Sequence, residues 1–147
     1  MQIFIGADHN GYDMKARLIA ELRQAGHDVH DQGDHERQPD DDFPQFAAQV
    51  VTAMKAAGPE ARGILICGSG QGMCMAANRF KGIRAALCWN QNEARSARND
   101  DDANVLCLSS KYTSLDEAGS IMATFLSTPF AGAPRFTRRI EQLDQLT

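Results

Sequence analysis

Long hydrophobic runs are missing from this sequence, whose apolar stretches fall far short of the roughly 20 residues that a membrane-spanning helix needs. The N-terminus also lacks a basic segment followed by an apolar one, which is the pattern of a secretory signal. Positive charge is scarce as well, because 19 Asp and Glu outnumber 15 Lys and Arg and give a net charge of −4. We therefore expect a cytoplasmic protein that binds no membrane and is no general nucleic-acid binder.

Histidine and cysteine are limited in ways that constrain the chemistry. All four histidines precede residue 36, so a site built from later segments must use other acids and bases. Three of the four cysteines lie in or beside apolar segments, which indicates reduced thiols rather than a disulfide framework. The chain has no internal repeat, low-complexity segment or linker, and its length predicts one domain over residues 1–147.

Short apolar runs alternate with helix-like stretches along the whole chain. The predicted strands cover 2–7, 28–31, 64–66, 83–88 and 104–108, and the predicted helices cover 12–25, 43–58, 73–79, 91–98, 115–126 and 135–146. This alternation predicts an α/β domain with a parallel sheet and helices on both faces, whose ligands bind beyond the carboxyl ends of the strands. The polar segment 32–42, with five acidic residues, is typical of a solvated surface loop.

The segment Gly63 to Asn78 is the most informative stretch. An apolar strand ends at Cys67 and is followed by Gly68, Ser69, Gly70, Gln71 and Gly72 before the next helix begins. Glycines at alternate positions allow backbone N–H groups to face outward at a helix N-terminus, which attracts negative charge and favours a cysteine thiolate. The pattern indicates a nucleophile or base beside an oxyanion cradle. A tight turn with a buried, inert cysteine is the alternative.

The spacing excludes three better-known motifs. The glycines form G-x-G-x-G rather than the G-x-G-x-x-G of dinucleotide-binding folds, and no lysine follows them as in a P-loop. No second cysteine lies at C-x-x-C spacing from Cys67.

Three further groups of polar residues are candidates for the same site. Asp8 and His9 follow the first strand, where they hold a sugar hydroxyl and a phosphate or shuttle protons. The alternative is that Asp8 caps the next helix and His9 faces solvent. Arg135 and Arg139 share one helix face and form either a phosphate clamp or a solvated basic face, and Lys111 is a weaker basic candidate. The acidic run 100–102 is typical of a solvated loop, and a Mg²⁺ site there would need further ligands.

Taken together, these segments resemble the ribose-5-phosphate isomerase B family, which also includes the galactose-6-phosphate isomerase subunits. The matching segments are GADHNGY at 6–12, DFP at 42–44, RGILICGSGQG at 62–72, AAN at 76–78, GIRAA at 82–86, DANVL at 102–106 and the arginines of 135–139. The resemblance implies a flavodoxin-like five-stranded parallel sheet, and a homodimer or dimer of dimers whose sites are shared between subunits, with the C-terminal helix reaching toward the partner. It also implies aldose–ketose isomerisation of a sugar phosphate through a cis-enediolate, without metal or organic cofactor.

The resemblance also assigns roles to individual residues. Cys67 matches the family's base, and Gly68 to Gly72, with Ser69 and Gln71, match the loop that stabilises the enediolate. Asp8 and His9 match sugar-binding positions. Arg135 and Arg139 match the phosphate clamp, and Lys111 stands where the family usually has an arginine.

The segment RNDDDAN at 98–104 departs from the family's usual R-E-H-N-D-A-N. Asp100 stands in place of the histidine that opens the furanose ring, Asp101 stands in place of a sugar-binding asparagine, and Phe136 follows Arg135 where histidine is common. Ribose 5-phosphate is the default substrate that the resemblance implies. The alternative substrate is another sugar phosphate, such as the erythrose 4-phosphate/erythrulose 4-phosphate pair. The alternatives to an isomerase are a catalytically silent sugar-phosphate-binding subunit and a flavodoxin-like nucleotide-binding or phosphoacceptor domain.

Overall fold

A computed structural model describes residues 1–146 and contains one parallel sheet of five strands, β1 (Gln2–Ala7), β2 (Asp28–Asp31), β3 (Arg62–Cys67), β4 (Ala85–Leu87) and β5 (Val105–Ser109). The strands lie in the order β2-β1-β3-β5-β4, and every pairing is parallel. The central strands β1, β3 and β5 are almost wholly buried, which explains their continuous apolar sequences. The predicted α/β architecture is thereby confirmed.

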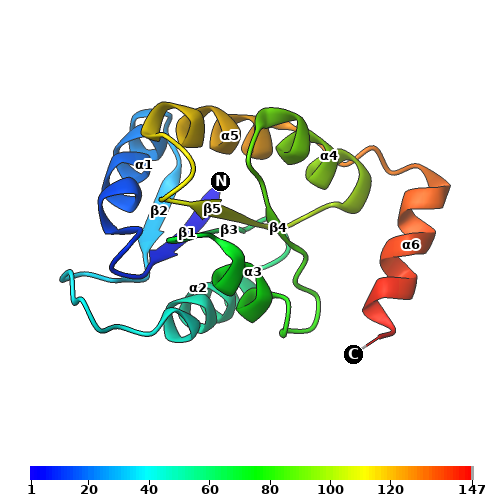
Figure 1. Cartoon of the computed structure of the whole chain (residues 1–147). Coiled ribbons are helices and arrows are strands. Elements are labelled where there is room, and N and C mark those ends of the chain that lie inside the picture. Colours follow the sequence, from blue (N-terminus) through cyan, green and yellow to red (C-terminus); the bar gives the residue numbers. More distant parts are fainter. Residues whose placement is uncertain (147) are drawn as a thin grey trace.

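Six helices complete the described fold: α1 (Tyr12–Gln24), α2 (Phe43–Ala57), α3 (Gln71–Ala77), α4 (Gln91–Asp101), α5 (Leu115–Ser127) and α6 (Pro134–Asp144). Helices α1, α4 and α5 cover one face of the sheet, while α2 and α3 cover the other (Figure 1). Side chains alternate along each strand, so Ile64 and Ile66 pack under the first layer, whereas Leu65 and Cys67 pack under the second. The Cys67 thiol therefore belongs to the face that α2 and α3 cover.

The order of the last two strands differs from the 2-1-3-4-5 order of flavodoxin. Strand β5 lies between β3 and β4. After β3 the chain therefore skips the adjacent position, forms β4 at the edge, and then returns to fill the gap with β5. The register pairs Cys67 with Ser109 and Ala7 with Ile66. The exchange therefore brings the end of β5, rather than the end of β4, beside the cysteine.

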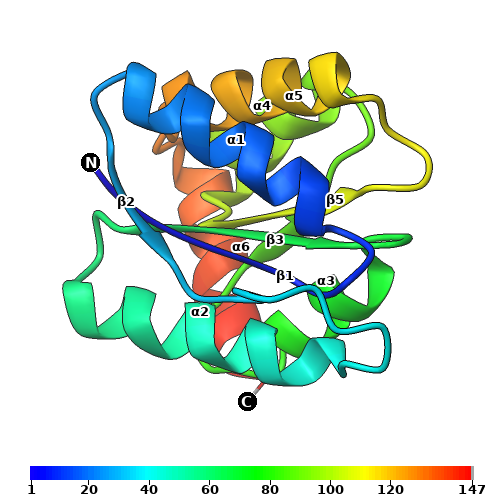
Figure 2. The ribbon, with the colours of Figure 1, turned by 90° about the vertical axis from the view of Figure 1, so that its left-hand side faces the viewer.

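Helix α6 lies apart from both layers, beyond the edge strand β4 (Figures 1 and 2). It packs mainly against α4, and Phe136 is its one buried residue. Leu143 and Leu146, near the chain's end, are 50% and 79% exposed. Among the described helices, none has the length and apolar character to cross a membrane.

Candidate active site

The turns after β1 and β3 lie side by side at the carboxyl edge of the sheet. Asp8 is buried, and its backbone N–H donates to the carbonyl of Ile66 at 3.2 Å, immediately before Cys67. Asp8 Oδ1 accepts hydrogen bonds from the N–H groups of Asn10 (2.9 Å) and Gly11 (3.2 Å). Burial raises the pKa of Asp8, although those two N–H donors oppose the shift. The carboxyl group is thus fixed next to the strand that ends in the cysteine.

Cys67 is the buried last residue of β3. Its carbonyl oxygen accepts hydrogen bonds from the backbone N–H of Ser110 at 3.0 Å and from the Ser110 hydroxyl at 3.2 Å. The next carbonyl, that of Gly68, accepts hydrogen bonds from the Ser109 hydroxyl at 2.7 Å and the Lys111 N–H at 3.0 Å. The start of the glycine turn is therefore held by the segment that follows β5.

The glycines of this turn are required by conformation and by space. Gly70 has a φ of +76°, and a Cβ there would lie 2.5 Å from the Leu87 side chain. A Cβ on Gly72 would lie 2.7 Å from the Phe43 ring. Ser69 Oγ accepts a 3.3 Å hydrogen bond from the Gln71 N–H, which helps to fold the chain into α3. The turn predicted between residues 67 and 72 is therefore present, and it is tightly packed.

His9 is joined to an acidic residue that sequence reasoning missed. Asp41 Oδ1 lies 2.6 Å from His9 Nδ1 and also accepts the His9 backbone N–H at 3.1 Å. The hydrogen bond that His9 donates to the Asp41 carboxylate raises the pKa of His9. The segment 32–42, which we expected to be a solvated loop, instead folds its last turn against this site. Three successive acidic residues at 40–42 were the only signal, and they did not indicate which one turns inward.

Lys111 is exposed, but its backbone reaches this edge through the Gly68 carbonyl. The structure thus brings together Asp8, His9, Cys67, the glycine turn and the first residues of the loop that follows β5. All of them lie at the carboxyl edge of one sheet, as the sequence predicts.

Asp100 and Asp101 lie at the opposite edge. Helix α4 extends to Asp101, three residues beyond the predicted end, and returns the chain to the start of β5. These residues are separated from Cys67 by about the length of β5, roughly 16 Å at about 3.3 Å per residue. Within one chain, the site of Cys67 therefore does not include them.

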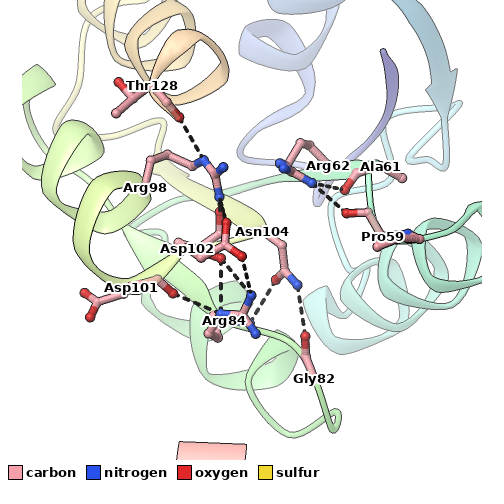
Figure 3. Close-up of polar contacts among 11 residues, drawn as sticks. Pro59, Ala61, Arg62, Gly82, Arg84, Arg98, Asp101, Asp102, Asn104 and Thr128 are labelled. Atoms are coloured by element: carbon pink, nitrogen blue, oxygen red, sulfur yellow. Dashed lines mark hydrogen bonds and ion pairs between the residues drawn. The ribbon is translucent and has the colours of Figure 1, made fainter. Parts of the chain in front are cut away.

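The junction between α4 and β5 is held by arginines (Figure 3). Asp102 ends the helix in the left-handed conformation, with φ +46°, which Asp tolerates better than most residues. Its carboxylate accepts Arg98 Nη1 at 2.6 Å and Arg84 Nη2 at 3.1 Å. Arg84 Nε also donates to the Asp101 carbonyl at 2.9 Å. This network fixes the backbone that carries Asp100 and Asp101, although both carboxylates remain outside it.

Arg135 and Arg139 lie on the exposed surface of α6. The Arg135 guanidinium lies over the Phe136 ring, 4.3 Å from its centroid. A hydrogen bond from the Ala131 N–H to the Asn99 carbonyl, at 3.1 Å, ties the approach to α6 to the end of α4. The predicted site residues thus form two groups in this chain, one around Cys67 and one around α6 and the end of α4.

The profile of the Ribose/Galactose Isomerase family matches residues 3–143. The chain belongs to this family. The resemblance inferred from the sequence is thereby confirmed, and the protein is an aldose–ketose isomerase. It is 43% identical to the probable ribose-5-phosphate isomerase B of Mycoplasma pneumoniae over 141 residues, which are 96% of this chain and 91% of that protein.

Solved structures of the family show the same fold. The ribose-5-phosphate isomerase B of Mycoplasma genitalium, with bound ribulose 5-phosphate, superimposes with a TM-score of 0.95 at 40% identity and covers 99% of this chain and 95% of that one. The enzyme of Thermotoga maritima superimposes with a TM-score of 0.93 at 40% identity and covers 98% and 97%. The differing order of β4 and β5 therefore belongs to an established isomerase fold.

Proposed function

We propose that this isomerase interconverts ribose 5-phosphate and ribulose 5-phosphate without a metal or organic cofactor. The observation that carries the proposal is the position of Cys67, at the end of β3, beside Asp8 and before a glycine turn that admits no side chain at residue 70. The bound ribulose 5-phosphate of the Mycoplasma genitalium enzyme supports this choice of substrate.

Cys67 is the proposed base. Its thiolate would take the proton from C2 of the open-chain aldose and return it to C1, so that a cis-enediolate forms between the two steps. The developing oxyanion requires donors that are already oriented, and the N–H groups of the turn from Gly68 to Gly72 are suited to that task. Asp8 and His9 would bind the sugar hydroxyls. Because Cys67 must stay a free thiol, we also propose a reducing, cytoplasmic setting.

A second subunit would complete the site. Arg135, Arg139, Asp100 and Asp101 lie away from their own chain's Cys67, and α6 stands off the body with exposed leucines near its end. We propose a homodimer, or a dimer of dimers, in which α6 and the end of α4 reach the Cys67 site of the partner. The two arginines would then clamp the substrate phosphate, with Lys111 as a further cation.

Asp100 supports one second candidate. Asp100 stands where the family usually has the histidine that opens the furanose ring, so a four-carbon sugar phosphate, which closes no furanose ring, is the alternative substrate.

Proton exchange with solvent tests the proposed reaction. Ribose 5-phosphate in D₂O should yield ribulose 5-phosphate with deuterium incorporation detected by NMR, and Cys67→Ala should lower this rate by several orders of magnitude. The matched control is Cys88→Ala, because burial raises the pKa of the Cys88 thiol to about 12 and keeps it protonated. A Cys67→Ala protein within a few-fold of the parent would exclude the cysteine base.

A further inference from the structure

The proposed reaction leaves one chemical task without a residue. Ribose 5-phosphate is largely a closed furanose, and its C1–O4 bond must break before a proton can leave C2. An acid at the ring oxygen accelerates the breaking of that bond, and this chain has Asp100 where the family usually has the ring-opening histidine. Of the four histidines, only His9 adjoins Asp8 at the end of β1.

The surroundings of His9 hold its ring in one orientation. Nδ1 is engaged by Asp41 Oδ1 at 2.6 Å, and the same oxygen accepts the His9 backbone N–H. The Asp41 side chain is 4% exposed, whereas that of His9 is 30% exposed. Within residues 1–146, Nε2 has no hydrogen-bond partner and is the ring nitrogen left for a ligand. A histidine whose Nδ1 is bound to a buried carboxylate presents Nε2 as its acidic position.

The second oxygen of the Asp41 carboxyl group strengthens the demand for a positive charge on His9. Asp41 Oδ2 is buried and receives no donor from the described residues. Burial would raise the pKa of Asp34, but the N–H of Gln38, the Asp41 carboxyl group and the N–H of Glu36 together lower it. A buried carboxylate oxygen that lacks a donor favours a compensating positive charge nearby. An imidazolium at His9 supplies that compensation on the Asp41 side.

We propose that His9, oriented by Asp41, is the acid that opens the furanose ring, in place of the histidine that Asp100 replaces. In this step the imidazolium Nε2–H protonates O4 and the C1–O4 bond breaks. The anomeric hydroxyl loses its proton to solvent water, and C1=O forms. His9 is left neutral and regains a proton from water. His9 is thus the catalytic residue and Asp41 the positioning residue. The inference rests on the proposed function, because only a cyclic substrate needs the step.

A metal site is the competing interpretation of the same residues. Ligand atoms of Asp8, His9 and Asp41 all lie within 4.8 Å of one another. However, His9 Nδ1 and Asp41 Oδ1 are bonded directly to each other, and Asp8 Oδ1 already accepts two backbone N–H groups. The arrangement is that of a histidine–carboxylate pair.

The variant Asp41→Asn tests the pair with little structural change. The amide oxygen of the substituted side chain still accepts the Nδ1–H, and its NH₂ group can donate to Asp34, so the fold should be retained. The imidazolium loses its counter-charge. Turnover of ribose 5-phosphate should fall at least about ten-fold. The matched control is Asp40→Asn, an exposed carboxylate of the same loop, which should leave turnover unchanged.

A second measurement separates ring opening from proton transfer. Ribulose 5-phosphate is acyclic, so exchange of its C1 protons with D₂O needs Cys67 but no ring step. This exchange should stay within about three-fold of the parent in Asp41→Asn, while aldose turnover falls. If both rates fall together, or neither does, His9 is not the ring-opening acid.

The pH profile provides a readout that a purely structural role would not move. Three charged neighbours face His9: Asp41 and Asp8 raise its pKa, and Arg37 lowers it. The acid must be protonated, so ribose 5-phosphate turnover should fall on the alkaline side, and Asp41→Asn should move that fall to lower pH. If the alkaline fall in turnover occurs at the same pH in Asp41→Asn and in the parent, the proposal is overturned. A parent protein that never isomerises ribose 5-phosphate would instead overturn the proposed function.

Discussion

Gly70 passes so close to β5 that a Cβ on it would lie 3.0 Å from the backbone carbonyl of Leu108. That contact is with main chain in the middle of the sheet, so it cannot be relieved by rotating a side chain. The proposed oxyanion turn is therefore held directly against the strand that ends beside Cys67.

Gly70→Ala should consequently abolish most activity and destabilise the fold by about 1–3 kcal/mol, because it adds backbone strain and a clash. Gly82→Ala is the matched control. Gly82 has nearly the same φ, +78°, but a Cβ there meets nothing within 4 Å. Both variants add strain at a positive φ, and only Gly70→Ala also displaces the turn. Measuring activity and thermal denaturation of both variants therefore separates the two effects. Equal activity losses in the two variants would show that the contact with Leu108 is unimportant.

The residues around Cys67 could be predicted because their signals are local. An apolar strand followed by alternating glycines indicates a strand-to-helix turn wherever it occurs. Strand order is a different matter, since nothing in the periodicity of residues 83–88 or 104–108 specifies which strand lies at the edge. The exchanged order of β4 and β5 could therefore not be predicted from the sequence, although it determines that Ser109 neighbours the cysteine.

Asp41 could not be predicted because its partner is 32 residues away. Residues 40–42 are identical in type, and only the path of the chain decides which carboxylate is buried. The end of α4 was misplaced for a related reason. Asn99, Asp100 and Asp101 are poor helix formers, and they are helical because Asp102, held by Arg84 and Arg98, closes the helix beyond them.

The phosphate clamp yields a prediction with a control on the same helix. Arg135→Ala and Arg139→Ala should each weaken substrate binding by about one to two decades, since a charge-assisted hydrogen bond contributes roughly 1.5–3 kcal/mol. Arg138 is also exposed on α6 and lies one residue from Arg139, so Arg138→Ala should bind normally. Inhibition by inorganic phosphate should be lost in Arg139→Ala but kept in Arg138→Ala. Equal inhibition of both variants would place the clamp elsewhere.

Mixing two defective variants, assayed at a substrate concentration too low for Arg139→Ala to bind appreciably, tests whether the sites are shared. If Cys67 and Arg139 of one site come from different subunits, a heterodimer of Cys67→Ala and Arg139→Ala contains one intact site and one doubly defective site. Random reassortment should then restore about a quarter of the parent activity. Subunits can be exchanged by co-expression or by joint refolding. A mixture no more active than its components would mean that each site uses a single chain.

The pair of His9 and Asp41 should also be visible in stability. Because the pKa of His9 is raised in the folded protein, its contribution is fully present below the unfolded value of about 6.5 and is lost as pH rises through the folded value. The melting temperatures of the parent and His9→Gln should differ most near about pH 6 and converge toward about pH 9. A difference that grows with pH would contradict the direction of the shift. This measurement needs no substrate and is independent of activity.

Asp100→His distinguishes the two accounts of ring opening. If the parent lacks a ring-opening acid and prefers a four-carbon sugar phosphate, the new histidine should raise ribose 5-phosphate turnover and leave erythrose 4-phosphate turnover unchanged. If His9 already opens the ring, Asp100→His should change the parent by less than about three-fold but should restore much of the loss caused by Asp41→Asn, because a second imidazole can protonate O4. The parent, Asp100→His, Asp41→Asn and the double variant should be assayed with ribose 5-phosphate and erythrose 4-phosphate. The two accounts predict different patterns of turnover across these four proteins. A gain in the parent without rescue of Asp41→Asn would assign the role to position 100 and leave His9 only as a sugar-binding residue.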